Sequence, residues 1–382
     1  MPWKDHSVSQ VRLGFAHAVR SAGVPVVEAC RRFGISRKTG YKWLARFDAQ
    51  TVAGLEDHSR RPLHSPRRTD APIEGMILAA RDRFGWGGRK IRAYLIHHGH
   101  SASSLPSART TQAILARHGK VHPTTDATPK PLECFERSAP HDLWQADHKG
   151  AIEVARKDTF PLVVVDDHSR YLIALHPCHD KSMALAWNVF WNAFGEFGLP
   201  KSVLTDNAFG TTFDVPKTLS WFESQLVRLR IDSIHGRPYH PQTQGKVERF
   251  NGTLEREMLP RARTDQPQHF ATDAAAFREL YNHTRPHEAL GDKPPVSRFA
   301  KSPRERPDTL PEADSFYPAG SELRKVASSG DIRWAGSRIL AGRGLVGQTV
   351  RLEEREHELA VFYCWKQIRA IPRERLGLNG ML

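Results

Sequence analysis

The sequence predicts a multidomain protein with an all-α N-terminal part, a central α/β domain on a mixed sheet, and a small C-terminal β-barrel. The chain has 382 residues, which is long for one domain, and its hydrophobic content of 39% is enough for several cores. Helical periodicity gives way near residue 129 to strand-like alternation, and again near residue 315 to short strand-like runs. Segments rich in proline and arginine precede the second helical block and the last domain.

The charge of the chain points to an anionic partner. Lys and Arg number 56 against 42 Asp and Glu, which gives a formal net charge of +14. Nucleic acid is the first candidate, ahead of a membrane surface or an acidic protein. No apolar run approaches the roughly 18 residues of a membrane span, and the first residues lack the apolar region of a signal peptide. The four cysteines form no CxxC pair, so we expect a cytoplasmic, reducing environment.

Residues 1–58 are expected to form a helix-turn-helix DNA-binding domain. Three helical patterns follow one another, and the third begins at Ser36, a good N-cap, and should bury Tyr41, Leu44 and Phe47. A plain helical hairpin with a solvated basic face is the alternative, and the overall charge favours DNA binding. The third helix would present four side chains to a DNA groove: Arg37, Lys38, Thr39 and Lys42.

A second helical block is expected over residues 70–122. Its three helical patterns each end in glycine, and the last begins at a Pro-Ser pair. This is typical of a second helix-turn-helix-like DNA-binding domain, although the pattern is weaker than the first. His97, His98 and His100 could suggest a metal site, but no carboxylate or thiol lies at ligand spacing, so surface positions are expected.

Residues 130–300 are expected to form the α/β domain. The segment 141–154 alternates as one strand, and 160–178 predicts two more strands joined by a turn at 166–170. Helices and strands then alternate, so the order predicts a mixed sheet with helices on both faces. Short alternating runs over 315–375 predict a five-strand barrel.

Three carboxylates occupy unusual places in the α/β domain. Asp147 ends the first predicted strand, Asp206 ends an apolar strand, and Glu248 lies one turn into a helix. Residues at the carboxyl ends of strands gather at one rim of the sheet, where three carboxylates would repel one another unless a cation is present. Oxygen ligands suit Mg²⁺ or Mn²⁺, and two such ions about 3.5–4 Å apart support phosphodiester chemistry.

The helix that contains Glu248 is expected to direct this acidic side chain and its basic neighbours to different sides. Apolar residues form a stripe around Val247, and Glu248 projects beside that stripe, about 100° away, toward the sheet edge. Lys246, Arg249 and Arg256 are expected to point the other way.

Plainer interpretations exist for each carboxylate taken alone. An Asp after a strand is commonly a turn former, and a Glu in a first helical turn is commonly there for the helix dipole. Asp166 and Asp167 compete as carboxylates but fit a hairpin turn, and Glu255 ranks second to Glu248. The combination in a basic chain favours the metal site.

Several motifs resemble a known family. WQADHKG, VLTDNAFG and HPQTQGKVERFNGTLEREM, followed by YNHTRPHEALGDKPP, resemble the DDE catalytic core of insertion-sequence transposases related to retroviral integrases. The two helical blocks are similar to the DNA-binding portions of the same bacterial transposases. The resemblance spans most of the chain and implies an RNase H-like core. In that core Asp147, Asp206 and Glu248 would be the catalytic triad that binds Mg²⁺ or Mn²⁺, with two ions per active site.

The resemblance also implies an activity and partners. The protein would bind double-stranded DNA at the ends of its element, cut there, and join the ends to target DNA as a homo-oligomer, a dimer or larger, associated with the bacterial nucleoid. Asn207 and Gln244 would line the site. Lys246 would contact DNA near the scissile phosphate, and Arg249 is expected to contact DNA as well. The C-terminal barrel would resemble a small DNA-contacting domain.

Two departures from the family pattern leave open whether this copy is fully active, and two alternative functions stand beside the proposed one. Ala208 stands where the family usually has glycine, and the gap between Asp206 and Glu248 is longer than in the tightest members. The first alternative is a catalytically silent DNA-binding regulator derived from a transposase, against which the intact triad argues. The second is an RNase H-like nuclease that hydrolyses DNA without joining it.

Overall fold

The computed structural model divides into two compact units, Met1–Arg68 and Thr69–Leu382. Within the described part of the chain, no helix is long and apolar enough to cross a membrane. The residues whose structure is described are 7–57, 68–121, 136–205, 218–235 and 245–376.

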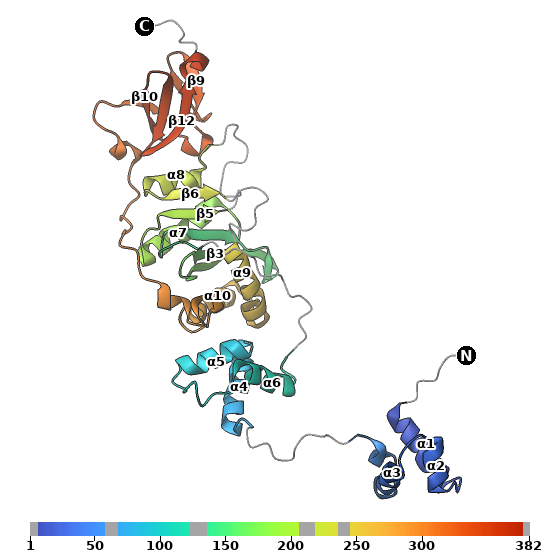
Figure 1. The fold of residues 1–382 in the computed structure, drawn as a ribbon. Coiled ribbons are helices and arrows are strands. Elements are labelled where there is room, and N and C mark those ends of the chain that lie inside the picture. The colour runs from blue at the N-terminus through green and yellow to red at the C-terminus, as the bar shows by residue number, and fades with distance from the viewer. Residues whose placement is uncertain (1–6, 58–67, 122–135, 206–217, 236–244, 377–382) are drawn as a thin grey trace. The chain divides into compact units, whose positions relative to one another are not determined.

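The first unit is a bundle of short helices with the predicted helix-turn-helix order (Figure 1). Its helices are α1 (Val8–Arg20), α2 (Val26–Arg32) and α3 (Arg37–Gln50). Ser36 caps α3, because its hydroxyl accepts a hydrogen bond from the Thr39 amide at 3.2 Å. Gly34, with φ 64°, supplies the left-handed residue of the turn before it.

The prediction for the buried side of α3 was wrong at Tyr41, which is 58% exposed. Leu44 is buried and Phe47 is partly buried, as expected, while Trp43 takes the place assigned to Tyr41. The reason lies one residue earlier: Gly40 faces the bundle so closely that a Cβ there would lie 2.5 Å from Cys30 Sγ. Tyr41 is about 100° round the helix from Gly40 and therefore faces solvent.

The second unit begins with three helices, α4 (Ala71–Phe84), α5 (Gly88–His97) and α6 (Ala108–Arg117). They share a core with Ile77, Trp86, Ile91 and Leu115. Each of the three ends near a glycine with positive φ, as the sequence pattern indicated. His97 and His98 are exposed, and the described residues contain no cluster of three His, Cys, Asp or Glu that could hold a metal.

A mixed sheet forms the centre of this unit (Figure 1). The strand order is β2-β3-β1-β5-β6, and β4 also pairs with β3. β1 pairs antiparallel with β3 and parallel with β5. The segment predicted as one first strand is two strands, β1 and β2. The strands are β1 (Trp144–His148), β2 (Ile152–Val154), β3 (Lys157–Asp166), β4 (Leu172–Cys178), β5 (Ser202–Thr205) and β6 (Asp232–His235).

Helices cover both faces of the sheet, as predicted. On one face α7 (Met183–Phe197) and α8 (Trp221–Arg228) pack through an aromatic cluster around Trp144, Phe190 and Phe222. The other face carries α9 (Gly245–Thr253) and α10 (Pro267–His283), which bury residues such as Phe250 and Tyr281. A π-helical turn, Leu254–Met258, and a 3₁₀ turn, Leu259–Arg261, continue α9.

The C-terminal part differs from the predicted five-strand barrel. Among the described residues its ladders form a four-stranded sheet, β12-β11-β10-β7, and a separate hairpin, β8-β9, and they do not close on themselves. The alternating apolar runs were assigned correctly to strands, but alternation does not specify which edges pair. The strands are β7 (Glu322–Lys325), β8 (Asp331–Trp334), β9 (Ser337–Leu340), β10 (Thr349–Glu354), β11 (Glu358–Tyr363) and β12 (Lys366–Pro372).

This C-terminal part docks on α8 through a close backbone approach at Gly344. A Cβ on Gly344 would lie 2.3 Å from the Leu219 carbonyl oxygen and 2.5 Å from the Trp221 nitrogen. Trp365 reinforces the contact, because its indole donates a hydrogen bond to the Val227 carbonyl at 2.7 Å.

Gly344→Ala is therefore expected to lower the free energy of unfolding by about 1–3 kcal/mol, since backbone atoms must shift to admit the methyl group. Chemical denaturation measures the effect. Gly150→Ala is the matched control, because a Cβ there meets nothing within 4 Å. Equal unfolding midpoints for the two variants would contradict the close approach.

Candidate active site

Asp147 lies on the face of the sheet that α9 covers. It is the fourth residue of β1 and pairs with Val163 of β3, while Gln145 pairs with Val165. Directly opposed residues of neighbouring strands project to the same side of a sheet. Val163 and Val165 pack with Val247 of α9, so Asp147 and Gln145 also face that helix.

Helix α9 has the predicted apolar stripe. Val247, Phe250, Leu254 and Met258 are buried against β3, β4 and α10. Glu248, next to Val247, is exposed, and α9 contacts both β1 and β3. Two of the three predicted carboxylates thus lie on one side of the sheet, and the buried stripe fixes how the helix that carries Glu248 is seated.

The prediction that Lys246 points away from the sheet was wrong. Its side chain is only 9% exposed and forms an ion pair with the fully buried carboxylate of Asp167. Asp167 also accepts hydrogen bonds from Gln145 Nε2 and from the Arg137 amide, both at 2.7 Å. A buried carboxylate needs such partners, so it draws the lysine inward at the first turn of α9. The sequence assigned Asp167 to a hairpin turn, where it lies, but carried no signal for this partner.

The third carboxylate, Asp206, lies outside the described residues, as do Asn207 and Gln244. What is described is the strand that leads to Asp206: β5 ends at Thr205 and runs parallel to β1, with Gln145 opposite Leu204.

The donor chemistry around Asp147 and Glu248 fits a hard divalent cation. Carboxylate oxygens are the ligands that Mg²⁺ and Mn²⁺ prefer. Two buried oxygens on the same side, Gln145 Oε1 and Asn251 Oδ1, have no hydrogen-bond partner among the described residues. These two oxygens could accept hydrogen bonds from the water molecules that such an ion retains.

Glu255, the second choice to Glu248, is occupied by a different contact. It lies in the π-helical turn and forms an exposed ion pair with Lys149 Nζ at 2.6 Å. The hydrogen bond from Lys149 lowers the pKa of the Glu255 carboxyl. This pair joins the end of the helix to the loop after β1.

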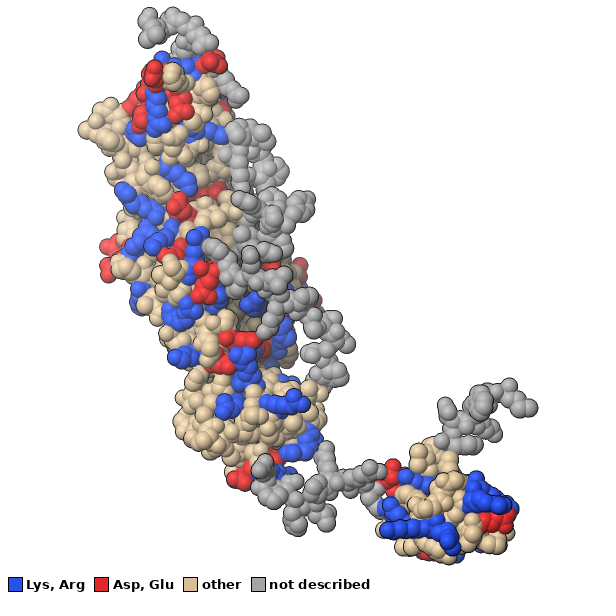
Figure 2. Space-filling view, in the orientation of Figure 1, with Lys and Arg blue, Asp and Glu red and all other residues tan. Residues whose placement is uncertain are grey.

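In the first unit, the side chains expected to meet DNA lie on the outer side of α3. Arg37, Lys38 and Lys42 are exposed and have no carboxylate partner among the described residues, while Thr39 is half-buried. Lys42 also lies over the ring of Trp43, with 4.9 Å between Nζ and the ring centroid. Figure 2 shows Lys and Arg outnumbering Asp and Glu on the visible face of this unit.

Sequence reasoning missed Glu257, the carboxylate that joins the three leading helices to the α/β domain. It lies in the π-helical turn and binds three donors: Arg285 through two hydrogen bonds of 2.7 Å, Lys90 Nζ at 2.7 Å, and the Trp86 indole at 2.8 Å. Only the RPH run after α10 marks one of these partners, because Arg285 belongs to it.

Comparison with family models finds two parts in the chain. Models described as "Integrase core domain" match residues 137–241 and 229–295, which together span the α/β domain. A model described as "Helix-turn-helix domain" matches residues 15–62, and one described as "Homeodomain-like domain" matches 39–115.

Two relatives match part of the chain. The "Insertion element IS476 uncharacterized 39.2 kDa protein" of Xanthomonas euvesicatoria is 25% identical over 315 residues, covering 78% of this chain and 86% of the relative. The "Pol polyprotein" of equine infectious anemia virus is 30% identical over 202 residues, but the match covers 50% of this chain and 16% of the polyprotein.

The similar solved structures have low sequence identity to this chain and low TM-scores. A chain of the simian T-cell lymphotropic virus intasome in complex with PP2A regulatory subunit B56 gamma is 17% identical with a TM-score of 0.37, covering 79% of this chain and 99% of that one. The HTLV-2 integrase catalytic core domain in complex with magnesium is 17% identical with a TM-score of 0.33, covering 43% and 99%.

The order of these parts defines the class of the protein. The chain belongs to the integrase superfamily, since its α/β domain is an integrase core. Within that superfamily it is an insertion-sequence transposase, with helix-turn-helix DNA-binding units ahead of the catalytic core.

Proposed function

We propose that this transposase cuts DNA at the ends of its element and joins those ends to target DNA, with Asp147, Asp206 and Glu248 as the metal-binding catalytic residues. The observation that carries the proposal is that Asp147 and the helix of Glu248 share one face of the sheet. The parallel strand β5 supports it further, because its last residue, Thr205, directly precedes Asp206 in the chain.

The residues of this chain would divide the work between holding and orienting. The carboxylates would hold Mg²⁺ or Mn²⁺, with two ions per site. When bound, these ions would supply a Lewis acid and activate a water or a 3′-hydroxyl. The buried Val247 keeps Glu248 in place. Gln145, two residues before Asp147 on β1, donates a hydrogen bond to Asp167, the partner of Lys246. Lys246 would add positive charge for the scissile phosphate, with Arg249, Asn207 and Gln244 as further DNA contacts.

The test is an assay of the full chain with DNA that carries the element's inverted repeats, with and without Mg²⁺. We expect nicks at the element ends and covalent products that join them to target DNA. Nicks without joined products would show that the protein is a nuclease without strand transfer. DNA binding without any cut would show that it is a DNA-binding regulator.

Recognition of the element ends is assigned to α3 of the first unit. Arg37→Ala or Lys42→Ala should weaken binding to the ends about tenfold, since one such contact contributes about 1–3 kcal/mol. A gel-shift or anisotropy titration measures this. Arg20→Ala is the control, because Arg20, at the end of α1, is engaged by Asp48 near the C-terminal end of α3, away from the first turns that carry Arg37 and Lys42. Unchanged affinity in the α3 variants would place recognition elsewhere.

Assembly and location follow from the same proposal. Two element ends must be brought together, so we propose a homo-oligomer on DNA, a dimer or larger, that works at the bacterial nucleoid in the cytoplasm. Four functional domains are proposed, the last as a DNA-contacting domain: 1–58, 70–122, 130–300 and 315–375.

A further inference from the structure

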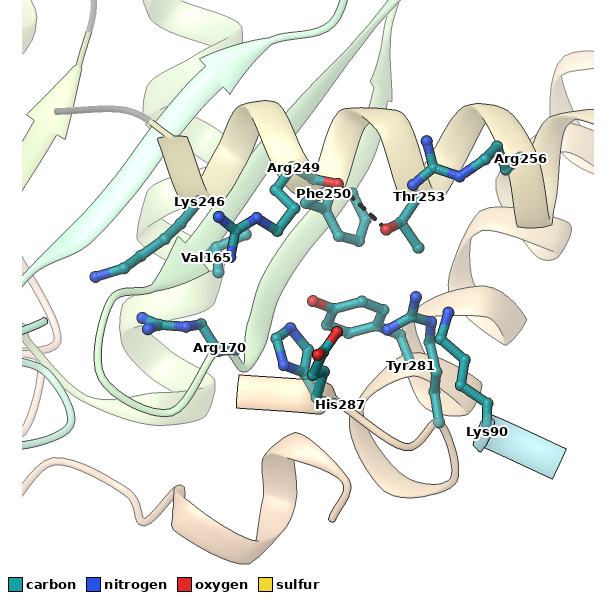
Figure 3. A pocket seen from close by; sticks show the side chains of 12 residues that line it. Lys90, Val165, Arg170, Lys246, Arg249, Phe250, Thr253, Arg256, Tyr281 and His287 are labelled. Carbon is teal, nitrogen blue, oxygen red and sulfur yellow. Dashed lines mark hydrogen bonds between the residues drawn. The ribbon is translucent and has the colours of Figure 1, made fainter. Parts of the chain in front are cut away.

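A cavity of about 180 Å³ lies beside α9, on the second unit, and has a strongly basic lining (Figure 3). Its walls come from α5, β3 and the turn after it, α9 with its π-helical turn, and α10 with the segment after it. Among the described residues that line it, Glu288 is the only one with a carboxylate. Six cationic side chains line the cavity: Lys90, Arg170, Lys246, Arg249, Arg256 and Arg285.

The carboxylates around this cavity do not neutralise all of its cations. Glu257 serves both Lys90 and Arg285, and Glu288 pairs with Arg89, which lies outside the lining. Asp167 and Glu136 serve Lys246 and Arg170.

Arg249 and Arg256 have no carboxylate partner among the described residues, and both are exposed. The cavity therefore keeps an excess of positive charge that a bound anion would neutralise.

The excess of positive charge affects the pKa values of neighbouring groups. Burial and then the charges of Arg285, Arg170, Lys90 and Arg249 lower the pKa of His287 to about 3, so its imidazole is neutral at physiological pH. Burial and the repulsion of Arg285 also lower the pKa of Lys90, although Glu257 attracts it.

The cavity also contains an unused hydrogen-bond donor. Tyr281 is 3% exposed, and its ring packs edge-on against Phe250 at 5.1 Å between centroids. Its hydroxyl forms no hydrogen bond with any described residue, and Figure 3 shows it directed to the side where Arg170 and Arg249 lie. Because Tyr281 lines the cavity, its hydroxyl can donate a hydrogen bond to an acceptor bound there.

We infer that this cavity binds a phosphate group, carried by a DNA strand or supplied as a free phosphate compound. Guanidinium groups and a tyrosine hydroxyl are donors that match phosphate oxygens, and the cavity has room for a phosphate. The DNA source rests on the proposed function, since Arg249 adjoins Glu248 on α9 and a strand anchored here would pass the active site.

The test uses pyrophosphate as probe, with the full chain in buffer without divalent metal. Isothermal titration calorimetry should show binding that Arg256→Gln weakens about tenfold or more and Tyr281→Phe about threefold to tenfold. Arg156→Gln, an exposed arginine of the β2–β3 turn, is the matched control and should bind as the parent does. No pyrophosphate binding, or equal binding by Arg256→Gln and Arg156→Gln, would overturn the inference.

A DNA arm separates the two sources of phosphate. For duplex DNA, the slope of log affinity against log salt should become shallower by about 0.9 in Arg256→Gln if one backbone phosphate is lost. An unchanged slope with weakened pyrophosphate binding supports the inference and assigns the cavity to a free phosphate compound. Neither arm requires cleavage, so the result is independent of whether Asp147, Asp206 and Glu248 form the active site.

Discussion

Asp147→Asn is expected to reduce metal-dependent nicking of element-end DNA by about a thousandfold or more, while DNA affinity stays within about twofold. The substitution keeps the size of the side chain but removes the charge that would hold the cation. Metal catalysis lowers the activation free energy by several kcal/mol, and each 1.4 kcal/mol changes the rate by a factor of ten. Asp147 lies on a strand whose preceding residues are buried, so the strand should persist. Nicking of labelled duplex at saturating protein measures the rate.

The matched control for this experiment is Asp158→Asn, an exposed Asp on β3 outside the proposed site, which should keep its activity. Glu248→Gln should behave like Asp147→Asn. Glu255→Gln should lose little, because Glu255 forms a surface ion pair with Lys149. If Asp147→Asn lost DNA affinity as severely as cleavage, its role would be structural and the metal site would have to lie elsewhere.

Features that follow local periodicity were predictable from the sequence. The stripe of Val247, Phe250 and Leu254 repeats at helical spacing, and the structure buries it. The cap at Ser36 and the glycines that end the helices of the second block are similarly local. So is the change from hairpin strands to alternating strands and helices, which predicts helices on both faces of the sheet.

Features that depend on which distant charges meet were not predictable. Lys246 lies on a helix with several cations, and nothing in its spacing shows that a buried Asp167 draws it inward. The choice between Tyr41 and Trp43 depended on how closely Gly40 approaches Cys30. In the C-terminal part the strands were predictable, but their pairing depends on contacts between edges.

Glu257→Ala is expected to destabilise the second unit by about 3–5 kcal/mol, because it leaves the buried Arg285 and the half-buried Lys90 without their shared carboxylate. It also removes the acceptor of the Trp86 indole, so the contact between the three leading helices and the α/β domain should loosen first. Chemical denaturation at pH 7 gives the energy, and hydrogen exchange over 69–121 would locate the loosening.

The control and a pH series distinguish this ion-pair contact from simple loss of packing. Glu255→Ala removes an exposed pair two residues earlier and should cost at most about 1 kcal/mol. Burial alone would raise the pKa of Glu257, but Arg285 and Lys90 lower it from 4.5 to about 2. Because the folded pKa is the lower one, its contribution, about 3 kcal/mol, is complete above pH 4.5 and is lost as pH falls toward 2. The stability difference between the parent and Glu257→Ala should therefore shrink across that interval. A difference that stays constant from pH 7 to pH 3 would mean that Glu257 acts through its packing and not through its charge.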